Sequence, residues 1–145
     1  MFVAPLLAAW AVAVSIWDLR ERRIPNALIA AAALAGIGLL LVRGHGVAGA
    51  GWLSSLAGVA VGALIWLPGY LVKKLGAGDV KLAGCIGGLL GGLAAVEAML
   101  VAGVALGVMS VMAGLSFGPT HRLPAAAALS TGFVVRMWSG PLWTG

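Results

Sequence analysis

The sequence predicts an all-α, polytopic membrane protein, a single domain over residues 1–145 built as a bundle of about six transmembrane helices. It is 62% hydrophobic and only 9% charged, with a mean hydropathy of +1.11, whereas soluble domains are roughly 25% charged. Its 23 glycines favour helices that approach each other closely. Because a bilayer offers the backbone no hydrogen-bond partner, the spanning segments must be helices.

The first apolar segment, residues 2–17, has no basic residue ahead of it and ends at Asp18 and a basic cluster. A cleavable secretory signal has the opposite arrangement, so we expect this segment to remain as helix 1. Its N-terminus is then outside and the loop 20–23 is cytoplasmic. Pro25 suits the first turn of helix 2, where its missing N–H costs nothing, and helix 2 is expected over 26–42.

Helix 3 is expected over 52–72, with Pro68 kinking or loosening its last turns. Lys73 and Lys74 mark its cytoplasmic end, and a glycine-rich turn follows. Helix 4 is expected to begin near Asp79 and end near residue 92. At ~1.5 Å per residue it is only about 20 Å long, short for a hydrocarbon core of ~30 Å. Either the bilayer thins there or Asp79 lies below its surface.

Helices 5 and 6 are expected over 94–115 and 124–138, joined by a polar loop. Glu97 is expected to be an acid of an outer loop. Glycines four residues apart favour backbone-to-backbone packing of helices 4 and 5. These glycines are Gly84, Gly88 and Gly92, then Gly87 and Gly91, and Gly103 and Gly107.

The charges agree with this path at every loop, since basic residues favour the cytoplasmic side. They are therefore topology signals, and the net charge of +5 does not indicate a nucleic-acid partner. Asp18 and Asp79 are placed together at the cytoplasmic end. The cytoplasmic basic residues are Arg20, Arg22, Arg23, Lys73, Lys74, Lys81 and Arg122, and the outer ones are Arg43 and Arg136.

Two acids at one depth suggest the chemistry of an aspartic protease. Carboxylates that share a site do not both ionise easily, so one retains a proton while the other acts as a base toward water. Such a site needs no metal, and Cys85 with two histidines gives no ligand spacing. Gly76 and Gly78 are expected to let an extended substrate approach the backbone, because glycine leaves room and accepts unusual dihedrals.

The residues alone leave other readings open. Asp79 is equally explained as the N-cap of helix 4, and Asp18 as a juxtamembrane acid paired with Arg22. Lys81 is explained by snorkelling to the surface. A small transporter subunit with these acids in a proton relay is an alternative function, as is a non-enzymatic scaffold of glycine-rich helices.

The run GAGDVKLAG at 76–84 resembles the GxGDxK signature of prepilin peptidases, aspartic membrane proteases that process type IV pilin-like precursors. Residues 18–26, an Asp followed later by Arg-Ile-Pro-Asn, resemble the first-aspartate motif of that family, and 123–129 resemble its last helix. The resemblance implies Asp18 and Asp79 as the catalytic pair. It implies site-shaping roles for Gly76, Gly78, Lys81, Arg23, Pro25 and Asn26. Presenilin-like proteases with other substrates share the GxGD run, so they remain an alternative.

Longer members of the prepilin peptidase family carry an N-terminal insertion with CxxC motifs and a second, N-methyltransferase activity. This sequence has one cysteine and no such insertion, so it resembles the short, peptidase-only members associated with tight-adherence (Flp) pili. The resemblance implies no cofactor, a pilin-like precursor as substrate, and the bacterial inner membrane as location, with the active site at the cytoplasmic face. Whether the chain forms a homo-oligomer is left open.

Overall fold

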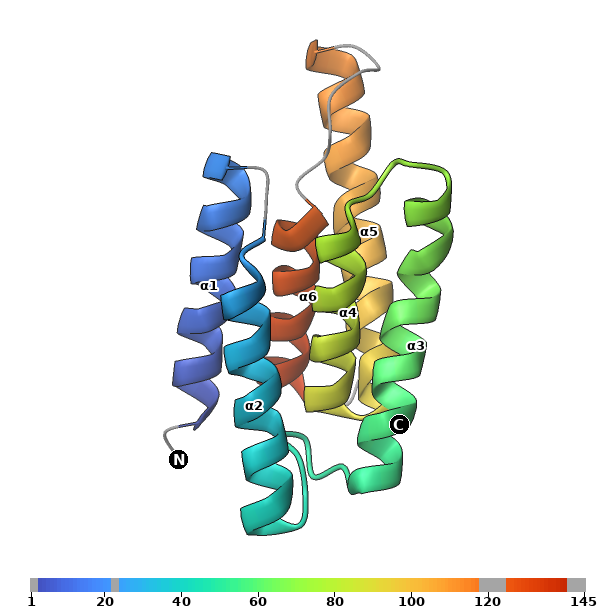
Figure 1. Cartoon of the computed structure of the whole chain (residues 1–145). Coiled ribbons are helices and arrows are strands. Elements are labelled where there is room, and N and C mark those ends of the chain that lie inside the picture. The colour runs from blue at the N-terminus through green and yellow to red at the C-terminus, as the bar shows by residue number, and fades with distance from the viewer. Residues whose placement is uncertain (1–2, 22–23, 118–124, 141–145) are drawn as a thin grey trace.

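The computed structural model describes residues 3–21, 24–117 and 125–140, and within them the chain forms six α-helices (Figure 1). The prediction of an all-α fold is confirmed. The helices are α1 (Val3–Glu21), α2 (Asn26–Arg43), α3 (Trp52–Leu71), α4 (Ala77–Leu90), α5 (Gly92–Phe117) and α6 (Ala125–Ser139).

Successive helices run in alternating directions, and α4 and α6 lie in the middle of the bundle (Figure 1). α4 packs against α2, α3, α5 and α6, while α6 also packs against α1 and α5. The core is accordingly rich in α4 and α6 side chains such as Leu82, Ile86, Leu129 and Phe133. Large apolar side chains remain exposed on the outer helices, as expected where lipid replaces water as the solvent.

Three of the described helices, α2, α3 and α5, are long and apolar enough to cross a membrane. α4 and α6 have 14 and 15 residues, about 21 Å and 23 Å, which is less than a hydrocarbon core of ~30 Å. They are enclosed by the longer helices. Figure 1 shows α5 extending well past the N-terminus of α4, so this end of α4 is recessed within the bundle.

The glycines of α3 and α4 bring the two helices into backbone contact. For α4, the glycine spacing in the sequence predicted such packing. A Cβ atom added to Gly58 would collide with the Gly87 backbone, and one added to Gly87 would collide with Gly58. Gly62 meets Ala83 in the same way one turn further along. The packing prediction is wrong for Gly103 and Gly107 of α5, because both face away from the bundle and a Cβ there would meet nothing within 4 Å.

Some expected boundaries shift, and two of these shifts concern the acids. α1 continues to Glu21, so Asp18 lies inside the last turn of a helix rather than after it. α4 begins at Ala77, so Asp79 is its third residue and not its N-cap. Pro25 precedes α2 with φ −62° and ψ 126° instead of opening its first turn.

Candidate functional site

The C-terminus of α1 and the N-termini of α2, α4 and α6 lie at the end of the bundle that is uppermost in Figure 1. The segment between α1 and α2 contacts the start of α4, where a Cβ added to Gly78 would lie 3.5 Å from the Ile24 Cβ. Trp10 ties α1 to α2 by donating from its indole Nε1 to the Leu28 carbonyl oxygen at 2.9 Å. The sequence motifs around Asp18 and Asp79 therefore lie at one end of the fold.

Asp18 is buried on α1, with 8% of its surface exposed. The backbone N–H of Ala126, in the first turn of α6, donates a hydrogen bond to its carboxylate. Amides in a first turn have no partner within their own helix, and the helix dipole favours an anion at that point. Within the described part of the chain, the buried Oδ2 atom of Asp18 has no hydrogen-bond partner. The carboxylate of Asp18 is therefore next to the N-terminus of α6.

Asp79 is half-buried in the first turn of α4. Its Oδ2 atom accepts a hydrogen bond from the Gly76 backbone N–H at 2.8 Å, and its own N–H donates to the Gly76 carbonyl oxygen at 3.1 Å. The carboxylate thus satisfies a backbone donor at the helix start, where the dipole also favours negative charge. This local bond fixes the orientation of one carboxylate oxygen.

Each of the two aspartates is thus held at a helix N-terminus, Asp79 at that of α4 and Asp18 at that of α6. These two helices pack against each other in the middle of the bundle. A region between two positive helix ends stabilises carboxylates, and also the negative charge that develops on a peptide carbonyl oxygen attacked by water. The arrangement suits general acid–base hydrolysis.

The other residues singled out in the sequence surround this end. Gly76 is the residue before α4, extended at φ −82° and ψ 155°. Neither Gly76 nor Gly78 has a positive φ, so the expectation of unusual dihedrals at these two glycines is wrong. Lys81 is exposed on α4, and because it is two residues from Asp79 it lies on another side of the helix. Pro25 is half-buried and Asn26 is exposed; Arg23 lies outside the described residues.

Sequence reasoning missed a buried ion pair at the opposite end of the bundle. Glu97 was expected in an outer loop, but it lies within α5, is only 3% exposed, and pairs with Arg136 of α6. The signal was present in the sequence: one acid and one base, each alone in an apolar segment, were already placed at the same outer depth.

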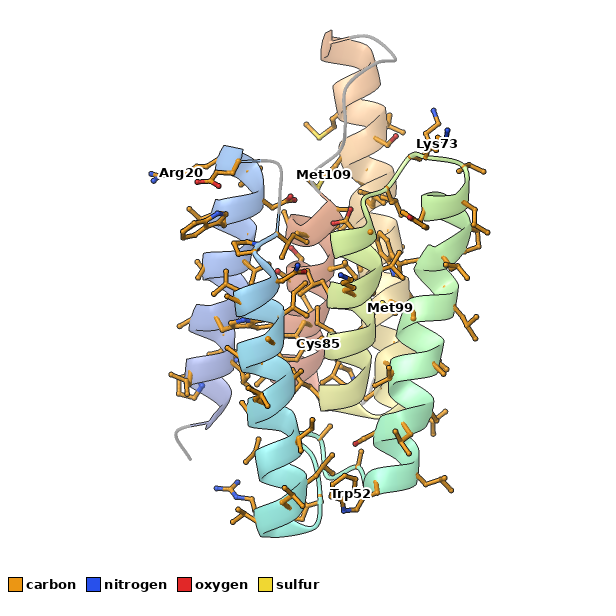
Figure 2. The ribbon with its side chains drawn as sticks, in the orientation of Figure 1. Arg20, Trp52, Lys73, Cys85, Met99 and Met109 are labelled. Carbon is orange, nitrogen blue, oxygen red and sulfur yellow. The ribbon has the colours of Figure 1, made fainter. Side chains whose placement is uncertain are left out.

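Among the described residues, no three His, Cys, Asp or Glu side chains gather where they could hold a metal ion. Cys85 instead contacts α2, its Sγ atom lying 3.7 Å from the Ile29 carbonyl oxygen. Figure 2 shows it midway along α4, well away from the helix end that carries Asp79.

Comparison with known proteins identifies the family. Residues 5–111 match the model of the type IV leader peptidase family, and this stretch includes both Asp18 and Asp79. Searches of curated proteins and of solved structures each gave no match. The match covers well over half of the chain, and the chain therefore belongs to the type IV leader peptidase family, a family of membrane proteases.

Proposed function

We propose that this membrane peptidase is an aspartic endopeptidase in which Asp18 and Asp79 are the catalytic pair. The observation that carries the proposal is that both carboxylates lie at one end of the bundle, each at the N-terminus of one of two central, adjacent helices. Glu21 at the end of α1 is exposed, and the proposed chemistry assigns it no role.

In the proposed reaction the two carboxylates share one water molecule and one proton. The ionised carboxylate takes a proton from the water while the oxygen of that water attacks the peptide carbonyl carbon. The protonated partner gives its proton to the carbonyl oxygen, which forms a gem-diol intermediate. The amine then leaves with a proton returned by the first carboxyl group, while the partner takes back a proton from a hydroxyl of the intermediate, so that both carboxyl groups regain their starting states. The backbone amides at the starts of α4 and α6 hold the carboxylates in orientation during these transfers.

The substrate we propose is a type IV pilin-like precursor of the tight-adherence (Flp) type. Such a precursor has a basic leader followed by an apolar helix, so its cleavage site lies at a membrane boundary. The proposal places Asp18 and Asp79 at the cytoplasmic face of the bacterial inner membrane, where the leader would emerge. In this proposal the enzyme cleaves the precursor without a cofactor and does not methylate the new N-terminus.

The direct test is co-expression with candidate pilins from the same genome, followed by cleavage assays with purified enzyme. Asp18→Asn and Asp79→Asn should each abolish conversion of the precursor to its mature length. Glu21→Gln is the matched control, because it removes an exposed carboxylate three residues after Asp18 and should leave cleavage intact. Membrane abundance of every variant is measured alongside.

Asparagine at position 79 retains an oxygen that can accept the Gly76 hydrogen bond, so the start of α4 should survive. If Asp79 served only to cap its helix, this variant would therefore cleave normally. Full cleavage by the Asp79→Asn enzyme at normal abundance would refute the aspartic mechanism, and transport of protons by the wild-type protein would then be the measurement to make.

A further inference from the structure

The contact between α1 and α6 has a simple register. Asp18 meets Ala126 at one end, and the Trp10 and Phe133 rings meet edge-on, with their centroids 6.1 Å apart, at the other. On α1, Val14 lies midway between Trp10 and Asp18. On α6, Ser130 lies four residues after Ala126 and three before Phe133, on the same side of the helix. The antiparallel register therefore sets Ser130 opposite Val14, one turn from Asp18.

Ser130 is buried, with 5% of its surface exposed, and its Oγ atom has no hydrogen-bond partner among the described residues. Serine and threonine in a helix commonly donate to the carbonyl four residues earlier. Ser15, Thr131 and Ser139 all do so here, with distances of 2.8–2.9 Å. The Ser130 hydroxyl is an exception, and a buried hydroxyl without a partner is costly.

The second unpartnered group on this contact is the Asp18 Oδ2 atom, also buried. Side chains on a helix lean toward its N-terminus. Because α1 and α6 are antiparallel, the Asp18 side chain leans toward the level of Val14, and the Ser130 side chain leans toward Ala126. Two unsatisfied polar atoms from facing helices are thus directed into the same interval, about one turn in height.

We propose that Ser130 is a positioning residue for the candidate catalytic site: its hydroxyl, through one buried water, is the hydrogen-bond partner of Asp18 Oδ2. This inference rests on the proposed function for its catalytic meaning. A water in a buried polar site needs at least two partners, and these two atoms supply them. The Ala126 amide would then hold the carboxylate from the helix terminus while Ser130 holds it from inside the bundle.

The kinetic test compares Ser130→Ala with Thr131→Ala. Thr131 is the adjacent residue, is exposed, and donates its hydroxyl within its own helix, so its loss should leave cleavage unchanged. Ser130→Ala should lower kcat roughly 10-fold to 100-fold, the range for losing a hydrogen bond to a charged group, with KM nearly unchanged. Ser130→Thr keeps the hydroxyl and should retain most of kcat. Equal kcat for Ser130→Ala and wild type would overturn the proposal.

A spectroscopic test separates this inference from the proposed function. The chain has only four acidic residues, so the carboxyl stretching band of Asp18 can be identified in the infrared spectrum by subtracting the spectrum of Asp18→Asn. Ser130→Ala should shift this band, and Thr131→Ala should not. An unshifted band in Ser130→Ala at normal abundance would overturn the proposed link. If the wild-type enzyme cleaves no pilin, the proposed function fails, and the band still decides whether Ser130 and Asp18 are connected.

Discussion

The guanidinium of Arg136 on α6 is paired with the carboxylate of Glu97 on α5 inside the bundle, the two side chains being 12% and 4% exposed. One turn away, Gly132 lies so close to the Ala98 carbonyl that a Cβ atom there would collide with it. The ion pair and the glycine contact together fix α6 along α5. α6 also presents the Ala126 amide to Asp18, so one helix carries the ion pair at one end and supports the candidate site at the other.

Replacing Glu97 with leucine should therefore destabilise the protein strongly, because it leaves Arg136 buried without its ion-pair partner. The expected loss is about 3–5 kcal/mol, the usual cost of breaking a buried pair. Replacing both residues with leucine should recover much of the stability, since apolar side chains need no partner. Thermal unfolding of the purified variants in detergent measures both effects. A double variant less stable than Glu97→Leu would contradict this account.

The α3–α4 contact gives a prediction about glycine. Gly87→Val should prevent normal accumulation of the protein, because the added side chain would collide with the Gly58 backbone. Gly103→Val is the matched control on α5, where an added Cβ meets nothing within 4 Å. Membrane abundance should fall for the first variant and stay near wild type for the second. Normal abundance of Gly87→Val would mean that the two helices are further apart.

Much of the fold could be predicted because the signals are local. Runs of apolar residues interrupted by charges and prolines gave all six helices, several to within two residues at each end. The motif spacing and charge pattern also placed Asp18 and Asp79 at one end. What failed depended on which side of a helix faces a neighbour. Gly87 and Gly103 both belong to glycine pairs four residues apart, but only Gly87 packs against another helix.

The contacts of the site were less predictable for the same reason. Nothing within the α1 sequence indicates that Asp18 meets Ala126, because that contact depends on the register between helices distant in the sequence. A prediction of the ion pair between Glu97 and Arg136 requires the knowledge that α5 and α6 pack directly against each other. The sequence predicts that α4 begins near Asp79, two residues later than it does, because Gly76 and Ala77 resemble a turn.

Membrane orientation is open to a direct test. Reporters fused after Arg23, Lys74 and Arg122 should be cytoplasmic, and a reporter at Gly46 should be external, because basic residues favour the cytoplasmic side. Gly46 lies between α2 and α3, at the end of the bundle opposite Asp18 and Asp79. A cytoplasmic reporter at Gly46 would place both aspartates outside and would exclude cleavage at the cytoplasmic boundary.

The proposed chemistry makes a prediction about cofactors. Cleavage should be insensitive to metal chelators, because the reaction assigned to Asp18 and Asp79 needs only water and two carboxyl groups. Mass spectrometry of the mature pilin should show an unmethylated N-terminus when this enzyme alone has processed it. Loss of cleavage in chelator with recovery on adding zinc would assign the reaction to a different class of protease.

The most demanding prediction concerns Asp18 and Asp79 acting as one unit. In a pair that shares a proton each carboxyl group needs the other, so the double asparagine variant should be no less active than either single variant. Two residues that contributed independently would instead show losses that add in free energy. Residual cleavage is measured for wild type, both single variants and the double variant at equal abundance, with Glu21→Gln as the carboxylate control. A double variant that is slower than wild type by the product of the two single losses would show that the carboxylates do not share one water. The aspartic dyad would then be replaced by two separate roles, with Asp79 supporting the start of α4 through Gly76 and Asp18 acting with the α6 terminus through Ala126.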